Sequence, residues 1–138
     1  MPFVIDESVA LCWLMPDERD AVALAAYARL SADTAIVPAL FWFEVRNVLV
    51  INERRGRLDP AKTSHALRVL KPLPITSDSE INEDSLLRLA KSHRLTVYDA
   101  AYLEIAQRRG LALATLDVAL AKAARAEAVP LLGSGLVG

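Results

Sequence analysis

Four acidic residues that are far apart in the sequence stand where an α/β fold would bring them together. They are Asp6, Glu44, Asp99 and Asp117. Carboxylates that share one pocket repel each other, so they need a compensating cation or bound protons. A site of oxygen ligands without His or Cys selects a hard divalent ion, Mg²⁺ or Mn²⁺. The pattern therefore predicts metal-assisted chemistry at a shared acidic site.

The composition fits one domain that spans residues 1–138. The chain has 138 residues, 54% of them hydrophobic, with a net charge of −1 and a single cysteine. One cysteine cannot form an internal disulfide, and no Cys/His cluster has the spacing of a zinc site. Charged residues interrupt every apolar run before the ~20 residues that a membrane span needs. We expect a cytoplasmic protein that does not enter a membrane.

Short apolar runs alternate with longer amphipathic segments, which predicts buried parallel strands separated by helices. The expected strands are 3–5, 35–37, 73–75, 111–115 and 129–132. The expected helices are 17–31, 38–55, 60–71, 80–93, 97–109 and 118–127, with a short helix over 8–14. This alternation predicts a three-layer α/β/α sandwich around a mostly parallel sheet of about five strands.

In such a fold, the four acids should meet at the carboxyl edge of the sheet, where ligands bind. Asp6 and Asp117 follow predicted strands, and Asp99 opens a helix that leads back to a strand. Glu44 falls in the second turn of its helix, on an apolar stripe, and Asp99 shares a stripe with Tyr102 and Leu103. A carboxylate on an inward-facing stripe is costly unless it is paired or binds a metal.

Helix capping offers an alternative explanation for three of these acids. Asp6 could cap the helix 8–14, Asp99 could form a capping box with Thr96, and Asp117 could cap the helix 118–127. Capping accounts for each position separately, but it does not explain why all four acids fall on one edge.

The basic residues gather in the middle of the chain. Residues 44–72 carry seven basic and three acidic side chains, whereas the flanking segments are net acidic. This segment is the best place for a surface that faces phosphates, although a solvated helix face explains the same charges. The candidate phosphate-contacting residues are Arg46, Arg54, Arg55 and Arg57.

Four segments in this order resemble the PIN-domain ribonucleases, and most closely the toxins of VapBC-type toxin–antitoxin pairs. Val4-Ile5-Asp6-Glu7-Ser8 resembles the opening strand of the family with its first acid, and Glu44-Val45-Arg46-Asn47-Val48-Leu49 resembles its E-x-x-N-x-L helix. Tyr98-Asp99-Ala100-Ala101-Tyr102-Leu103 resembles the Y-D-A-x-Y-L block, and Thr115-Leu116-Asp117 begins a segment similar to the last acidic block. The segments follow one another in the order of the family, so the resemblance extends over nearly the whole chain.

The resemblance implies a metal-dependent endoribonuclease, in which a metal-activated water attacks the phosphodiester bond, and it implies a homodimer with a cognate antitoxin. Asp6 and Asp99 would bind Mg²⁺ directly, and Glu44 and Asp117 would act through water or a second ion. The side chains that would orient these acids or water are Ser8, Asn47 and Thr115. The chain departs from the family at Glu7, where a small residue is usual, and strand alternation predicts that Glu7 points to solvent.

Two other functions remain open from the sequence. In a phosphoryl-transfer or receiver-like domain, Asp6 would accept a phosphoryl group, but Ser8 stands where phosphatases of that kind carry a second Asp. No Lys ends the segment 111–116, where a receiver domain would carry one. The second alternative is a PIN-like module that binds RNA or a protein without cleaving anything.

Overall fold

The computed structural model describes residues 1–133. Its strands are β1 (Phe3–Ile5), β2 (Ala35–Val37), β3 (Ile75–Ser77) and β4 (Leu113–Ala114). Its helices are α1 (Glu7–Leu14), α2 (Ala21–Arg29), α3 (Leu40–Arg54), α4 (Pro60–Leu70), α5 (Glu83–His93), α6 (Val97–Arg109) and α7 (Val118–Ala126). Every helix that the sequence predicts is present, with bounds that differ by a few residues.

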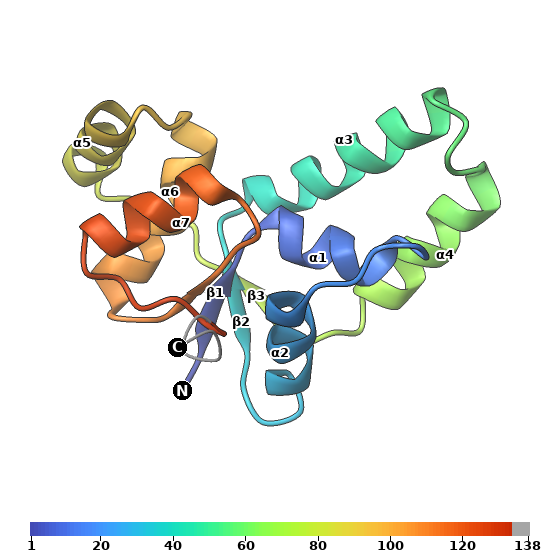
Figure 1. The fold of residues 1–138 in the computed structure, drawn as a ribbon, viewed down its shortest axis with the longest axis horizontal. Helices are drawn as coiled ribbons and strands as arrows, with labels where there is room; N and C mark the ends of the chain where they lie inside the picture. The colour runs from blue at the N-terminus through green and yellow to red at the C-terminus, as the bar shows by residue number, and fades with distance from the viewer. Residues whose placement is uncertain (134–138) are drawn as a thin grey trace.

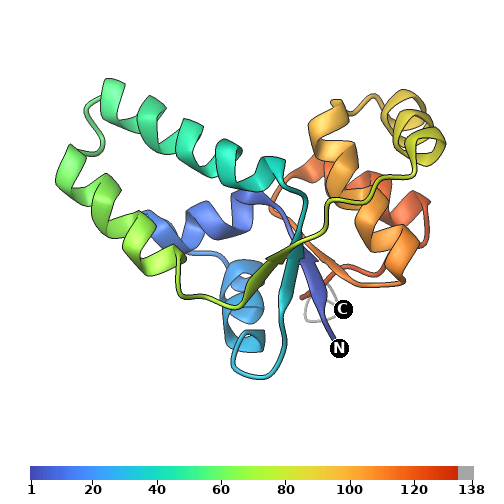
Figure 2. The same ribbon diagram turned by 180° about the vertical axis from the view of Figure 1, so that it is seen from behind.

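The sheet is parallel, with strand order β3-β2-β1-β4. Helices α1–α4 lie on one side of it and α5–α7 on the other, as Figures 1 and 2 show from opposite directions. The predicted α/β/α sandwich is thereby confirmed. The segment predicted as a fifth strand forms only an isolated parallel bridge between Leu131 and Leu113, so the described sheet has four strands rather than five.

Strand β3 begins two residues later than the sequence predicts, at Ile75. Pro74 has no N–H and cannot donate to a sheet, although its carbonyl accepts a bond from the Ala35 N–H at 2.9 Å. Regular pairing therefore begins after the proline and continues to Val37 opposite Ser77.

Side-chain caps set where most of the helices begin. The capping residues are Asp6, Asp20, Asp59, Asn82, Thr96 and Asp117, each of which accepts a bond from a backbone N–H of the helix that it starts. Three of these helices, α1, α6 and α7, begin at the carboxyl edge of the sheet or next to it. The local capping preference and the parallel topology thus bring three acid-bearing helix starts to one place.

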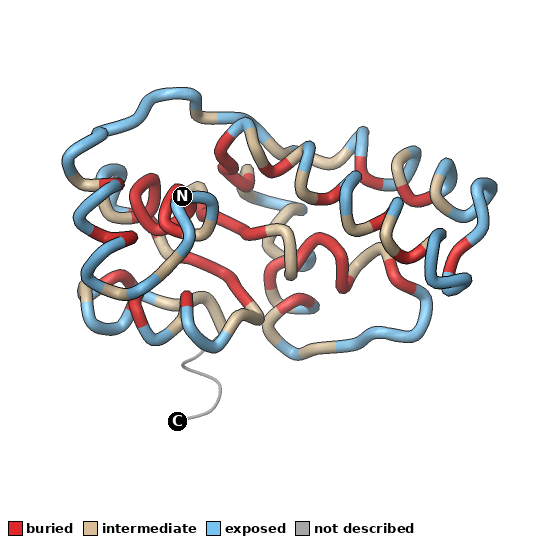
Figure 3. The backbone as a smooth tube through the Cα atoms, turned by 90° about the horizontal axis from the view of Figure 1, so that it is seen from above, coloured by how far each residue is buried: buried red, intermediate tan, exposed pale blue. Residues whose placement is uncertain are grey.

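The core lies along the central strands and the inner faces of the helices, where Figure 3 shows the buried parts of the backbone. Strands β1 and β2 are buried at every residue, as expected for strands covered on both faces. Helix α6 is buried over seven consecutive residues, Ala100–Ala106, so it is an internal helix. Within residues 1–133, no helix has both the length and the apolar character that crossing a membrane requires.

Candidate active site

Asp6 is buried at the end of β1, with only 1% of its surface exposed. Its Oδ1 accepts bonds from the Ser8 hydroxyl at 2.6 Å and the Val9 N–H at 3.3 Å, and its Oδ2 accepts a bond from the Thr115 hydroxyl. Burial and the neighbouring Glu7 charge raise the pKa of Asp6 to about 7, although these hydrogen bonds oppose the shift. Asp6 is therefore both the cap of α1 and a buried acid of the site.

Two hydroxyl groups connect Asp6 to the segment that follows β4. The Ser8 Oγ accepts a bond from the Leu116 N–H at 3.0 Å, and the Thr115 Oγ1 accepts one from the Asp117 N–H at 3.0 Å. These bonds hold the start of α7 against the end of β1. Asn47, the third residue expected to orient the acids, is exposed and makes no hydrogen bond to an acid of the site.

Glu7, Glu44 and Asp99 form a carboxylate triad. One oxygen of each carboxylate lies within 4.8 Å of an oxygen of the other two. The expectation that Glu7 points to solvent is wrong, because Glu7 is only partly exposed and its Oε2 is buried. Strand alternation does not extend to this position, since β1 ends at Ile5 and Glu7 is already the first residue of α1.

Electrostatic repulsion links all of these acids. Burial and the Glu44 charge raise the pKa of Glu7 to about 7. Burial also raises the pKa of Glu44, and burial together with the Asp117 charge raises the pKa of Asp99. No basic side chain within residues 1–133 forms an ion pair with an acid of the site. The site therefore concentrates negative charge without a protein cation to balance it.

Asp117 caps α7 and also lies near the triad. Its Oδ1 accepts bonds from the Ala119 and Leu120 N–H groups at 2.9 and 3.3 Å. Its negative charge helps to raise the pKa of Asp99. Asp117 can therefore cap α7 and belong to the acidic site at the same time.

Tyr102 is a residue of the site that the sequence indicates only as part of an apolar stripe. It is fully buried in α6, and its hydroxyl donates to Glu44 Oε1 at 2.6 Å. Burial and this hydrogen bond raise the pKa of Tyr102 far above its usual range, so the phenol stays protonated as the donor. The sequence does indicate that Tyr102 lies near the site, because it is three residues from Asp99 and residues at that spacing share one face of a helix.

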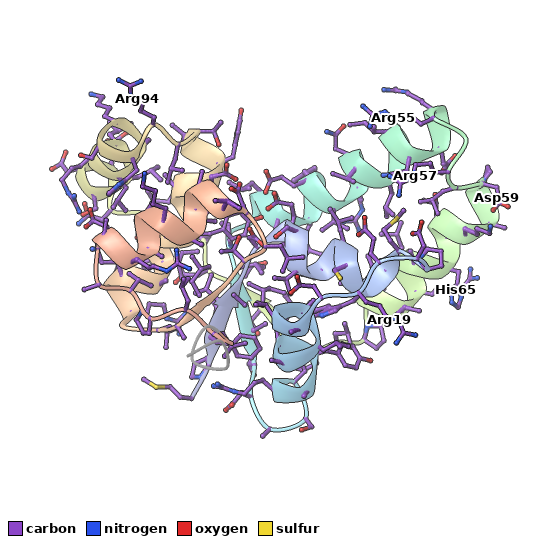
Figure 4. The ribbon with its side chains drawn as sticks, in the orientation of Figure 1. Arg19, Arg55, Arg57, Asp59, His65 and Arg94 are labelled. Carbon is purple, nitrogen blue, oxygen red and sulfur yellow. The ribbon has the colours of Figure 1, made fainter. Side chains whose placement is uncertain are left out.

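A groove of about 490 Å³ leads away from the acids along α1 and α3. Ser8 and Leu116 line it beside Asp6 and Asp117, and Arg55 and Arg57 line it near the end of α3. Figure 4 shows these two arginines on the opposite side of the molecule from Arg94. The other two candidate arginines are exposed outside the groove, and Arg46 donates to the Trp42 carbonyl at 2.9 Å.

The geometry disfavours Asp6 as a phosphoryl acceptor. A nucleophilic carboxylate must reach its substrate, whereas Asp6 is buried and both of its oxygens accept hydrogen bonds. The structure instead defines a class of protein: a three-layer α/β domain whose acids meet at the carboxyl edge of a parallel sheet.

Comparison with known proteins identifies the family. Residues 3–126 match the PIN domain family, and the chain belongs to it. The sequence is 36% identical to Ribonuclease VapC3 of Pyrobaculum aerophilum over 126 residues, which cover 88% of this chain and 94% of that protein. It is 39% identical to Ribonuclease VapC3 of Mycobacterium tuberculosis over 101 residues, or 72% of each chain. The predicted resemblance to VapC-type PIN domains is confirmed.

Two further comparisons concern the fold and the kind of nuclease activity found among similar proteins. The crystal structure of PAE2754 from Pyrobaculum aerophilum superposes with a TM-score of 0.65 at 28% identity, covering 89% of this chain and 87% of that one. The Exonuclease VapC9 of the same organism is 38% identical over 76 residues, 54% of this chain and 56% of that protein. The similar proteins therefore include both ribonucleases and an exonuclease.

Proposed function

We propose that this protein is a metal-dependent endoribonuclease and the toxin of a toxin–antitoxin pair. The observation that carries the proposal is the carboxylate triad of this PIN domain, which has no basic ion-pair partner among residues 1–133. The VapC ribonuclease relatives support the nuclease activity. The cognate antitoxin, the homodimer and the cytoplasmic location belong to the same proposal.

The residues present fit a hard divalent ion, Mg²⁺ or Mn²⁺. The triad offers only oxygen ligands, and one oxygen of each carboxylate lies within 4.8 Å of an oxygen of the other two. Asp6, Glu44, Asp99 and Asp117 would hold the ion directly or through water. A divalent ion in such a site supplies Lewis-acid chemistry, which lowers the pKa of an attacking water and offsets charge on the phosphate.

The protein side chains would then have separate tasks. The hydroxyl groups of Ser8 and Thr115 fix the Asp6 carboxylate, and Tyr102 fixes Glu44. Such partners keep metal-binding groups in one orientation. Arg55 and Arg57 would contact the RNA backbone along the groove, where phosphate contacts position the strand without reading its sequence.

A cleavage assay tests the proposal and separates it from the alternatives. We expect the purified protein to linearise a circular RNA in Mg²⁺ or Mn²⁺ and to leave it intact in EDTA, because only an endonuclease can open a circle. Cleavage restricted to the ends of a linear RNA would show an exonuclease instead. Binding of RNA without any scission would show the non-catalytic module, and cleavage at full rate in EDTA would contradict the metal requirement.

A further inference from the structure

The two most exposed aromatic side chains of residues 1–133 stand next to acids of the triad. Phe43 is 76% exposed and directly precedes Glu44, and Tyr98 is 61% exposed and directly precedes Asp99. Consecutive Cα atoms are about 3.8 Å apart, so each ring starts beside a carboxylate of the site. Within the described residues, neither ring makes an aromatic contact and the Tyr98 hydroxyl has no hydrogen bond.

Phe43 belongs to a run of three aromatic residues, and the other two are used by the fold. Phe41 is fully buried, and Trp42 lies edge-on to it with the ring centroids 5.0 Å apart. The Trp42 indole N–H also donates to the Ser77 hydroxyl at 2.9 Å. Single exposed apolar residues are ordinary, but two unpacked aromatic rings beside one site form a surface suited to a ligand.

The exposed face of α3 continues from Phe43 with basic residues and without an acid. Its members are all exposed and lie at helical spacings over about 16 Å: Phe43, Arg46, Asn47, Val50 and Arg54. The groove uses a different set of α3 residues, which are Val48, Ile51, Asn52 and Arg55. Two surfaces therefore lead away from the site along α3, which extends outward from the centre of the molecule (Figure 1).

An endonuclease needs two such surfaces. The strand that it cuts continues on both sides of the scissile phosphate, and the groove with Arg55 and Arg57 receives only one of these flanks. Proteins that bind single strands combine basic side chains for the backbone with aromatic rings on which bases stack. No aromatic residue lines the groove, whereas the exposed face of α3 together with Tyr98 offers both kinds of side chain.

We propose that Phe43 and Tyr98 stack on bases of the second flank, while Arg46 contacts its phosphates. The inference rests on the proposed endoribonuclease activity and names base-contacting residues for it. Every base has a π-face, so this pair holds a strand without reading its sequence. A ring can stack on a base only where a neighbouring base does not already cover it, so the nucleotides on this flank must be unstacked.

Binding of RNA oligonucleotides in EDTA, where the strand stays intact, tests the inference independently of cleavage. We expect Phe43→Ala and Tyr98→Ala each to weaken binding by at least about five-fold, the cost of losing one stacked base. Phe43→Trp should keep the affinity, and Phe43→Leu, which is apolar but has no π-face, should lose as much as the alanine variant. The control is Leu24→Ala, which removes a side chain that is 61% exposed on α2 and should leave the affinity unchanged.

Abasic nucleotides locate the contact along the strand. RNA that lacks one base near the cleaved bond should bind the wild type more weakly when the missing base lies on the second flank. Phe43→Ala should lose no further affinity for that abasic RNA, because the base and the ring act as one pair. Equal losses in the wild type and the variant for every abasic position would overturn the stacking contact.

The other outcomes separate this inference from the proposed function. Wild-type affinity in both alanine variants, with circular RNA still cut, would overturn the base contacts and leave the endonuclease standing. RNA binding that depends on Phe43, in a protein that never cuts RNA, would overturn the activity and leave the base contacts. Absence of any RNA binding in the wild type would overturn both.

Two controls exclude other causes of a lost affinity. Phe43 is exposed, so Phe43→Ala should melt at the wild-type temperature, and full RNA affinity in Phe43→Leu would show that stacking is not the contact. Light scattering measures the mass of each variant. A dimer that becomes a monomer in Phe43→Ala, together with the lost affinity, would assign this face to a second copy of the chain and overturn the inference.

Discussion

The hydroxyl of Tyr102 donates to Glu44 Oε1 at 2.6 Å, and this bond joins α6 to α3 across the acidic site. The two residues are 58 positions apart in sequence. Tyr102 is fully buried, so its ring cannot follow Glu44 if that side chain moves. The bond therefore fixes the Glu44 carboxylate relative to Asp99, which lies one turn earlier on α6.

Tyr102→Phe tests this positioning role. The substitution keeps the buried ring and removes the donor, so we expect a loss of about 1.5–3 kcal/mol in the free energy of unfolding, as for a hydrogen bond to a charged group. We also expect RNA cleavage to fall several-fold. Urea unfolding and single-turnover cleavage measure the two effects. Tyr98→Phe, at an exposed tyrosine on the same helix, is the control and should change neither.

The stability of the metal-free protein should fall as pH rises from about 5 to 8. Asp6 and Glu7 have pKa values of about 7 in the folded protein, against about 4 in an unfolded chain. The folded state therefore binds more protons in this interval, and the free energy of unfolding decreases with a slope of at most about 1.4 kcal/mol per pH unit for each group. The lowered pKa of Glu127, about 2, contributes stability that is lost only in stronger acid.

Urea titrations in EDTA at several pH values measure this dependence. Glu7→Gln should reduce the slope, because one of the two groups is then absent. Added Mn²⁺ should restore stability most strongly near pH 8, where the carboxylates are ionised and free to bind it. A metal-free protein that is equally stable at pH 5 and pH 8 would show that burial and the neighbouring charges do not raise the pKa values of Asp6 and Glu7.

The sequence predicts the fold and part of the site for identifiable physical reasons. Alternation of apolar runs with amphipathic segments reveals parallel strands and their helices, and the apolar stripe around Glu44 reveals that this acid faces inward. The orientation of Glu7 depends on where β1 ends and α1 begins, because Glu7 is the first residue of the helix and not part of the strand. Element boundaries cannot be predicted from the sequence to within one residue. The bond between Tyr102 and Glu44 depends on how α6 is rotated against α3, which no local pattern encodes.

Asp99→Asn should abolish RNA cleavage and leave the fold intact. The change removes one charge from the triad while preserving the shape of the side chain, and it relieves repulsion with Asp117. We expect a rate loss of at least about 100-fold, the scale on which removal of a charge-stabilising group acts, with a melting temperature in EDTA equal to or above that of the wild type. Asp84→Asn, an exposed acid in the first turn of α5, should retain full activity. Cleavage by Asp99→Asn at the wild-type rate would refute the assignment of Asp99 and the triad to the active site.

Replacing Arg55 and Arg57 together by Ala should weaken RNA binding without affecting the chemical step. Both side chains line the groove that starts beside Ser8, at a distance from the acids. Each phosphate contact to a single strand contributes about 0.7 to the slope of log affinity against log salt, so the double variant should lower that slope by about 1.4. Arg57 also lies 3.9 Å from Asp17, but this exposed pair contributes little to stability.

Binding isotherms over a range of salt concentrations, with single-turnover rates at saturating protein, separate affinity from catalysis. The control is the double variant Lys91→Ala and Arg125→Ala, which removes the same charge from exposed positions on α5 and α7. If both double variants lose the same affinity, the effect is that of net charge alone. A loss confined to Arg55 and Arg57, with an unchanged cleavage rate at saturation, would place the RNA backbone in this groove, because only a strand lying there can release counterions at those two side chains.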